Sequence, residues 1–168
     1  MRDSQLMYSK FVEGTLQATL DAATPFSRRI FARRCMSPEE VESFLKEWEV
    51  ATLTTVRPDG RPHASIGSFC YDEGRLYFYS NRASARHRNI IRNGRIAVTV
   101  VDGWGRQLIV EGETRIVGVA SDLTSHVAGN SFRKKYGNFT GDRGSSSYVI
   151  EMTPNKIFSY KSKGRRDD

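Results

Sequence analysis

A chain of 168 residues in which 38% are hydrophobic is long enough to bury one core without the help of a disulfide or a structural metal. Its 26 lysines and arginines outnumber its 19 acidic residues, and the resulting net charge of +7 favours anionic partners of any kind. The two cysteines, Cys35 and Cys70, lie too far apart for a metal-binding motif, and no apolar run is long enough to span a bilayer. Because the N-terminus also lacks a signal-peptide pattern, we expect a cytoplasmic protein with no membrane partner.

The two ends of the chain are predicted to lie outside the main domain. Residues 1–36 are predicted to form a helical arm, because apolar residues recur near helical spacing before the arginine pairs Arg28-Arg29 and Arg33-Arg34. We expect this arm to pack on the main body or on a partner subunit. Residues 162–168 are predicted to be a flexible basic tail, which leaves residues 37–161 as the main domain.

A clear helix start follows the arm. Ser37 is a favoured N-cap, Pro38 suits the first helical position, and Glu40 completes a capping box. Apolar side chains then recur at three- and four-residue intervals, at Val41, Phe44, Leu45 and Trp48. This spacing predicts an amphipathic helix over residues 38–48.

From residue 50 the pattern changes to that of short strands. Alternating, β-branched segments predict strands at 51–56, 63–71 and 75–80, with turns rich in proline and glycine between them. A helix from Ser84 is predicted to end at Gly94, which would adopt a left-handed C-cap conformation. Such closely spaced hairpins are typical of an antiparallel meander.

The second half of the chain continues the strand pattern. Strands are predicted at 95–101 and 106–120, with Gly112 and Gly118 marking bulges or bends in the second of them. Ser121-Asp122 is predicted to cap a helix that reaches Tyr136, and a mobile loop at 137–146 follows. Two closing strands are predicted at 147–152 and 157–160. Roughly six strands with a helix inserted before the fourth predict a small closed barrel.

The junction between the strand at 75–80 and the helix from Ser84 is the most suggestive stretch. A helix N-terminus offers unpaired backbone N–H groups and a positive dipole end, which suit a phosphate. Ser84 can cap the helix and donate to a phosphate oxygen, and Arg86 can add charge-assisted hydrogen bonds. Two interpretations are therefore open: the phosphate site of a flavin-type cofactor, or an ordinary capped helix with solvated arginines.

Five motifs occur in a characteristic order between Phe44 and Gly118: the helix leading into residues 50–53, the hairpin 58–63, the strand 76–81, Ser84-Ala85-Arg86, and the segment 106–113. In this order and at this spacing they resemble the pyridoxamine 5′-phosphate oxidase-like, FMN-binding split-barrel superfamily. The resemblance implies a mainly β protein with helices, built as an antiparallel six-stranded split barrel. It also implies a homodimer with the cofactor at the subunit interface.

The resemblance further implies which residues bind FMN. Residues 65–68 would lie along the isoalloxazine ring, and Tyr79 and Ser80 would contact the ring or the ribityl chain. Ser84 and Arg86 would bind the phosphate, and Gln107 would reach the cofactor across a dimer interface. The implied cofactor-binding residues are Ser65, Ile66, Gly67, Ser68, Tyr79, Ser80, Asn81, Ser84, Arg86 and Gln107.

The chain departs from the true pyridoxamine phosphate oxidases at several positions. Ser65 stands in place of an arginine, Cys70 in place of a lysine, and Ala85 in place of a second basic residue. The C-terminal Arg/His segment that handles the substrate phosphate in those enzymes is also absent. We therefore do not expect vitamin B6 oxidation. The implied function is an FMN-dependent oxidoreductase acting on an unidentified small molecule.

Two other cofactors remain open because relatives of this size bind a 5-deazaflavin with an acidic tail, or haem. Five arginines could bind the acidic tail of a deazaflavin, or they could equally form a solvated helix face and hairpin. They are Arg57, Arg61, Arg82, Arg88 and Arg92. A haem relative would need an axial ligand, for which the sequence offers His63 or His87. A protein that binds flavin or haem without catalysis is a further alternative.

Other functional assignments are weaker. Cys70 has no recognisable base beside it, and no residues have the spacing of a metal site, so neither a nucleophile nor a metal is predicted. Trp104, at a hairpin tip, would either stack on a neighbouring subunit's flavin or close the end of the barrel. Nucleic-acid binding is not expected, because the arginines gather on one helix and the tail rather than alternating with aromatic residues.

Overall fold

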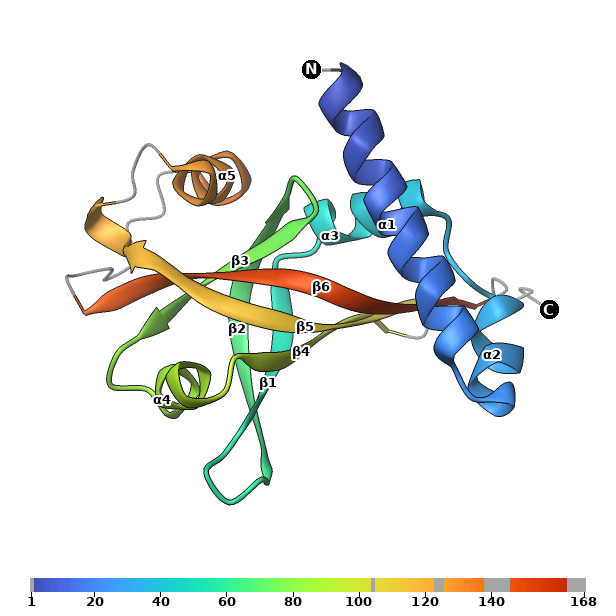
Figure 1. The fold of residues 1–168 in the computed structure, drawn as a ribbon. Coiled ribbons are helices and arrows are strands. Elements are labelled where there is room, and N and C mark those ends of the chain that lie inside the picture. Colours follow the sequence, from blue (N-terminus) through green and yellow to red (C-terminus); the bar gives the residue numbers. More distant parts are fainter. Residues whose placement is uncertain (1, 104, 123–125, 138–145, 163–168) are drawn as a thin grey trace.

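The structure is a computed structural model, and it describes the chain except for residues 1, 104, 123–125, 138–145 and 163–168. Figure 1 shows α1 crossing the barrel on one side, with α4 and α5 on the other side. The elements in chain order are α1 (Arg2–Ala22), α2 (Pro25–Ala32), α3 (Pro38–Glu47), β1 (Val50–Val56), β2 (Pro62–Asp72), β3 (Arg75–Asn81), α4 (Ala85–Arg92), β4 (Arg95–Asp102), β5 (Arg106–Val119), a 3-10 turn (Ala120–Asp122), α5 (Val127–Tyr136) and β6 (Ser147–Lys161).

The strands close into one antiparallel barrel in the order β1-β2-β3-β6-β5-β4. The predicted six-stranded barrel, with a helix inserted before the fourth strand, is therefore confirmed. The prediction of two separate closing strands is wrong, because residues 147–161 form the single strand β6. Beyond Met152 this strand pairs with β5 and has no partner in β3, so Pro154 can lack its N–H without breaking a second ladder.

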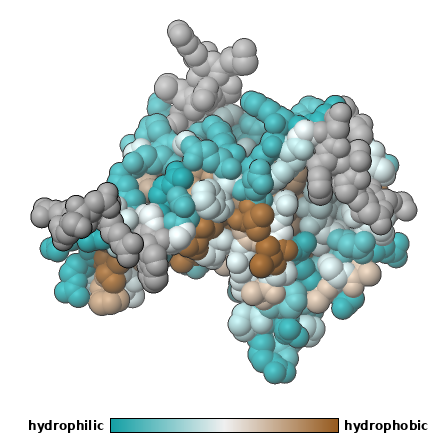
Figure 2. All heavy atoms as spheres, turned by 180° about the vertical axis from the view of Figure 1, so that it is seen from behind, coloured by the Kyte–Doolittle hydropathy of each residue, from teal (hydrophilic) through white to brown (hydrophobic). Residues whose placement is uncertain are grey.

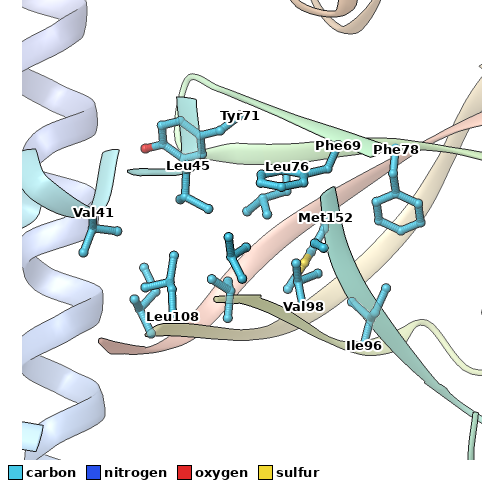
Figure 3. Close-up of a cluster of buried hydrophobic side chains, with 14 of the residues drawn as sticks. Val41, Leu45, Phe69, Tyr71, Leu76, Phe78, Ile96, Val98, Leu108 and Met152 are labelled. Carbon is cyan, nitrogen blue, oxygen red and sulfur yellow. The ribbon is translucent and has the colours of Figure 1, made fainter. Parts of the chain in front are cut away.

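Alternating side chains from all six strands fill the barrel interior. Leu53, Phe69, Phe78 and Val98 are fully buried there, and Figure 3 shows several of these side chains converging with Met152 and Leu108. Helix α3 closes one end of the barrel with the buried side chains of Val41 and Leu45. Helix α1 adds Val12 and Leu16 to the same core. The predicted division of the chain into arm, domain and tail stays a prediction.

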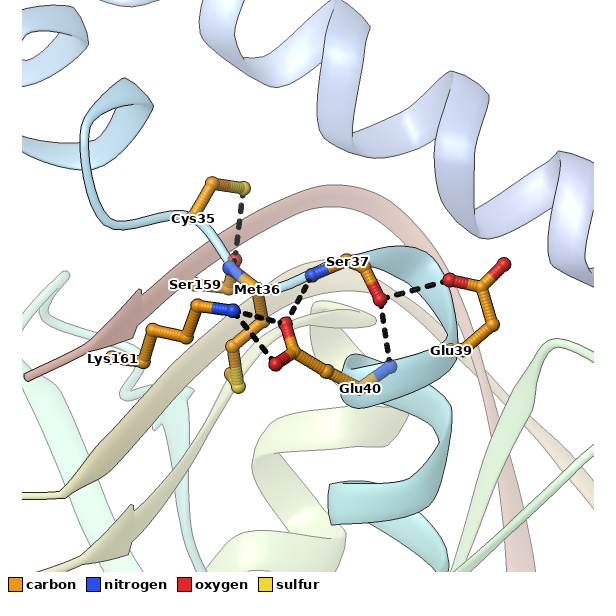
Figure 4. A network of polar contacts seen from close by, with 7 residues as sticks. All are labelled: Cys35, Met36, Ser37, Glu39, Glu40, Ser159 and Lys161. Atoms are coloured by element: carbon orange, nitrogen blue, oxygen red, sulfur yellow. Dashed lines mark hydrogen bonds and ion pairs between the residues drawn. The ribbon is translucent and has the colours of Figure 1, made fainter.

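The capping box predicted for α3 is present and connects the two ends of the main domain. The Ser37 hydroxyl accepts from the backbone N–H of Glu40, and the Glu40 carboxylate accepts from the backbone N–H of Ser37. Figure 4 shows that this carboxylate also accepts from Lys161, at 2.7 and 2.6 Å. Hydrogen bonds from Lys161 and then Ser37 hold the pKa of Glu40 below its usual value. The start of α3 is thus fixed to the end of β6.

The left-handed cap predicted at Gly94 is wrong. Helix α4 ends at Asn93 in an extended conformation with φ −148°, and Gly94 is not among the described residues with positive φ. Glycine is needed here for a different reason, since a Cβ would lie 2.9 Å from the carbonyl oxygen of Thr114. The backbone N–H of Thr114 donates to the Gly94 carbonyl at 2.8 Å, which holds the two backbones together.

The start predicted for the helix before Tyr136 is also wrong. Helix α5 begins at Val127, and its cap is His126, whose Nδ1 accepts from the backbone N–H of Ala128 at 3.1 Å. Ser121-Asp122 belongs instead to the separate 3-10 turn. The predictions for Trp104, for most of the loop at 137–146 and for most of the tail lie outside the described residues. No helix in the described part of the chain is long and apolar enough to cross a membrane.

The predicted irregularities in β5 are confirmed. The register of β5 against β6 shifts between Glu111 and Gly112, and again between Ile116 and Gly118. At the first shift the strands approach so closely that a Cβ on Gly112 would collide with the carbonyl oxygen of Thr153.

We predict that Gly112→Ala lowers the free energy of unfolding by about 3 kcal/mol or more, because backbone atoms of β6 cannot move away without breaking the ladder. Gly14→Ala is the matched control: this helical position has nothing within 4 Å of an added Cβ, so alanine should stabilise by about 0.5–1 kcal/mol. Urea unfolding of both variants measures the difference. Equal stabilities would contradict the tight β5–β6 approach.

Candidate functional site

The barrel splits between β2 and β3. These strands pair from Phe69↔Phe78 to Asp72↔Arg75, close to their shared turn. Before Phe69, β2 pairs with β1, and after Phe78, β3 pairs with β6. The two strands therefore diverge, and residues 65–68 and 79–81 lie on the two sides of the split.

Helix α4 begins at this split. Ser84 caps it as predicted, with its Oγ accepting from the backbone N–H of His87 at 3.1 Å. The hydroxyl of Ser80, a buried residue at the end of β3, lies 3.4 Å from the Ser84 hydroxyl. The Asn81 side chain stabilises the intervening turn, because its Oδ1 accepts from Ala83 at 2.9 Å. Two hydroxyls and a helix N-terminus thus share one corner.

Arg86 connects the two sides of the split. Its Nη1 donates to Ser65 Oγ at 3.0 Å and to the carbonyl oxygen of Ile66 at 3.4 Å, both on β2. Its Nη2 donates to the carbonyl oxygen of Tyr79 on β3 at 2.9 Å. Nε is buried and has no hydrogen-bond partner among the described residues. Burial lowers the pKa of Arg86, whose hydrogen-bond acceptors on β2 and β3 are all neutral oxygens. A partly dehydrated cation with neutral partners is an environment that favours an anion.

The edge of β2 that faces the split carries unpaired backbone donors. The Ile66 carbonyl points into the split, where it accepts from Arg86. Because the N–H and C=O of one residue in a strand lie on the same edge, the N–H of Ile66 also faces the split. Phe69 donates to Glu49 on the β1 side, so Ser68, one residue earlier, also faces the split. Among the described residues, no strand pairs with this edge between residues 65 and 68. The N–H groups of Ile66 and Ser68 are therefore available to a planar ligand.

Gly67 allows Arg86 to approach β2. A Cβ at this position would lie 3.1 Å from Arg86 Nη1 and 3.1 Å from Leu53 Cδ1, closer than nearly all real contacts. A larger residue would push the guanidinium away from the strand. The absence of a side chain at Gly67 therefore lets Arg86 lie against β2, and the predicted contact of Gly67 with a cofactor stays a prediction.

Three other residues that the sequence predicted to bind the cofactor have different surroundings in the structure. The ring of Tyr79 packs on Phe132 of α5, with centroids 4.3 Å apart, and its carbonyl oxygen accepts from Arg86 at the split. Asn81 Nδ2 donates to Ser146 Oγ at 3.3 Å, which gives this side chain a structural role. Gln107 lies away from the split. Ser68 of β2 pairs with Val50 of β1, β1 pairs with β4 on its other side, and Val101 of β4 pairs with Gln107 of β5. Three strand spacings separate it from Ser68, about 14 Å.

Sequence reasoning missed the role of two buried residues on α4. Asn89 Nδ2 donates to the hydroxyl of Thr55 at 3.0 Å, which anchors the helix to β1. His87 is 3% exposed, and its ring lies 5.0 Å from that of Tyr148. Its Nδ1 has no partner among the described residues, and burial followed by the charge of Arg82 lowers the pKa of His87. Asparagine and histidine are polar, so the sequence did not indicate that these two side chains are buried. Their burial follows from the packing of α4 against β1 and β6.

Three exposed apolar side chains lie on the outer face of β1, β2 and β4 next to the split. Val50, Ile66 and Val101 point outward from these strands, and Ile66 is 74% exposed. Figure 2 views the molecule from behind and shows apolar side chains gathered near the middle of this side, above the β1–β2 hairpin. Exposed apolar patches of this kind mark interaction surfaces.

The sequence model of pyridoxamine 5′-phosphate oxidase matches residues 37–161 of this chain, which cover all six strands. The chain belongs to the pyridoxamine 5′-phosphate oxidase-like superfamily. The resemblance inferred from the motifs is thereby confirmed. No sequence among the curated proteins is significantly similar to this chain.

Solved structures of this superfamily share the split barrel. The conserved hypothetical protein Rv2991 from Mycobacterium tuberculosis is 23% identical with a TM-score of 0.67, over 77% of this chain and 88% of that chain. An F420 reductase is 27% identical with a TM-score of 0.59, over 69% of this chain and 94% of that chain. The heme storage protein HutZ from Vibrio cholerae is 16% identical with a TM-score of 0.63, over 73% of this chain and 93% of that chain. One fold therefore supports reductase and haem-storage functions, and the function must be argued from the site.

Proposed function

We propose that the protein is an FMN-dependent oxidoreductase that acts on a small molecule, with the FMN phosphate at the N-terminus of α4. The observation that carries this proposal is Arg86, a half-buried guanidinium whose hydrogen-bond acceptors are neutral oxygens and whose buried Nε has no partner among the described residues. A phosphate beside it would supply the missing negative charge. Ser80 and Ser84 would add hydroxyl donors, and the α4 N-terminus would add its dipole.

The chain would bind the rest of the cofactor along β2. The N–H groups of Ile66 and Ser68 face the split and suit the carbonyl and ring-nitrogen acceptors of a flavin's pyrimidine edge. Gly67 keeps this part of the strand narrow. FMN, when bound, supplies hydride and electron transfer, so the protein needs no nucleophile of its own. The departures at Ser65, Cys70 and Ala85 leave vitamin B6 oxidation outside the proposal.

We also infer a homodimer with the cofactor at the subunit interface. The apolar face formed by Val50, Ile66 and Val101 adjoins the split, so a second copy covering this face would also cover a bound ring. Gln107 projects from the same face, three strands from Ser68. In a two-fold pair, Gln107 of one subunit would approach the cofactor of the other.

A deazaflavin-dependent reductase is the second candidate. It is favoured by the 27% identity to an F420 reductase and by the arginines beside the α4 N-terminus. Arg82 is exposed, and Arg88 Nη1 donates to the Ala83 carbonyl at 2.6 Å, so both flank the corner where an acidic tail would leave it. Haem binding is less favoured, because His87, one of the two suggested axial ligands, is 3% exposed.

We predict that Arg86→Ala weakens FMN binding about tenfold or more, since a charged hydrogen bond contributes about 1.5–3 kcal/mol. Ser84→Asp should weaken it similarly by charge repulsion while retaining the helix cap, which Ser84→Ala would lose at about 1 kcal/mol of stability. Fluorescence titration with FMN and with riboflavin, which lacks the phosphate, measures both affinities. Both substitutions should change the FMN affinity far more than the riboflavin affinity.

Arg29→Ala, on α2, is the control and should bind FMN normally. If Arg86→Ala lowered the affinities for FMN and riboflavin equally, Arg86 would only hold β2 in position and would not bind the phosphate. Unchanged FMN affinity in Arg86→Ala would place the phosphate elsewhere. A parallel titration with a deazaflavin separates the two candidate cofactors.

We predict that Ile66→Asp converts the homodimer to monomers, because it buries a charge in the apolar face. Ile91→Asp is the matched control, since Ile91 is 65% exposed on α4 and Ile66 is 74% exposed on β2. Light scattering during size-exclusion chromatography measures the mass. A wild-type mass of one chain, or a dimer that survives Ile66→Asp, would contradict this interface.

A further inference from the structure

An open cavity lies next to residues 70–72 of β2, on the opposite side of Phe69 from the β2 residues at the split. Its volume is about 240 Å³, and residues of α3, β2 and α5 line it. This volume is roughly eight times the ~30 Å³ that one water molecule occupies in the liquid, and it is smaller than that of drug-sized pockets. A cavity of this size suits a small metabolite. Its charged and polar lining residues are Lys46, Asp72, Ser131, Lys134 and Lys135.

Positive charge predominates in this cavity. Three lysines face one carboxylate, Asp72, whose Oδ2 already accepts from the Ser131 hydroxyl. Lys46 is 3.1 Å from Glu42 at the margin, and its side chain stays 48% exposed. Lys134 is exposed and has no ion pair within the described part of the chain. The lining residues of the cavity therefore carry three ammonium groups and one carboxylate, with the Glu42 carboxylate at the margin and Glu49 acting on Lys135.

Lys135 is held in place without a carboxylate among its hydrogen-bond partners. Its Nζ donates to the carbonyl oxygens of Leu45 at 3.1 Å and of Trp48, at the C-terminal end of α3. It also lies 4.3 Å from the centroid of the Phe69 ring. Burial lowers the pKa of Lys135 to about 8. Glu49 acts on this ammonium through its charge, and an anion in the cavity would stabilise the ammonium further by adding opposite charge.

We propose that this cavity binds a small oxyanion, whose oxygens contact the ammonium groups of Lys46, Lys134 and Lys135. The space beyond the anion is bounded by Cys70 and Tyr71, so an organic group attached to the anion fits there. The ligand is thus a small organic phosphate or a free inorganic oxyanion. This site is separate from the α4 corner, where Arg86 gathers its partners.

The test is an amide NMR titration with inorganic phosphate and with phenyl phosphate, at constant ionic strength set with chloride. We expect saturable shifts at residues 70–72 and 131–135 in the full-length protein. Lys46→Gln/Lys134→Gln, which changes two exposed side chains, should weaken binding at this site at least tenfold. Lys156→Gln, which changes an exposed lysine of β6 paired with Glu111 of β5, is the matched control and should bind as the wild type does.

Arg86→Ala distinguishes this cavity from the proposed FMN phosphate site. The shifts at residues 131–135 should persist in Arg86→Ala even where those at Ser84 disappear. Tighter binding of phenyl phosphate assigns an organic ligand, and equal affinities assign a free oxyanion. Shifts confined to the α4 corner, or wild-type affinity in the double lysine variant, would overturn the proposal.

Discussion

The contact on which the site depends is the hydrogen bonding of Arg86 across the split. Two strands that have stopped pairing expose backbone acceptors to solvent, and a single guanidinium reconnects them through Ser65, Ile66 and Tyr79. The same guanidinium carries a charge into a partly dehydrated place where its hydrogen-bond acceptors are neutral oxygens. Structural closure and the proposed anion affinity would therefore arise from one side chain. This coupling explains why the position needs a long, planar, permanently charged donor, which lysine does not provide.

The chemistry of the site is limited by how little charge it holds. Where the true pyridoxamine phosphate oxidases have further basic residues, this chain has Ser65, Cys70 and Ala85. Binding would rest more on hydroxyls, the α4 N-terminus and the backbone edge at Ile66 and Ser68 than on several cations. An F420 reductase and a heme storage protein share this fold, so the fold alone does not decide which group the split accepts.

Local signals predicted the fold well, and the site less completely. The capping box at Ser37 and the caps and turns before α4 depend on neighbouring residues, which a sequence pattern reports directly. The motif order also identified the strands that meet at the split. The misassigned cap at Gly94 shows the limit: its glycine is required by Thr114, twenty residues later, and periodicity carries no signal for that contact. The partners of Arg86 and the burial of His87 likewise arise from packing between distant segments.

The most direct test is the absorption spectrum of the freshly purified protein, recorded before and after heat releases any bound ligand. The account predicts the bands of oxidised flavin on the protein and FMN in the supernatant. A colourless protein that binds added deazaflavin but not FMN would contradict the choice of cofactor while keeping the anion site at Arg86. A colourless protein that binds neither would contradict the proposed oxidoreductase function and leave the split barrel standing.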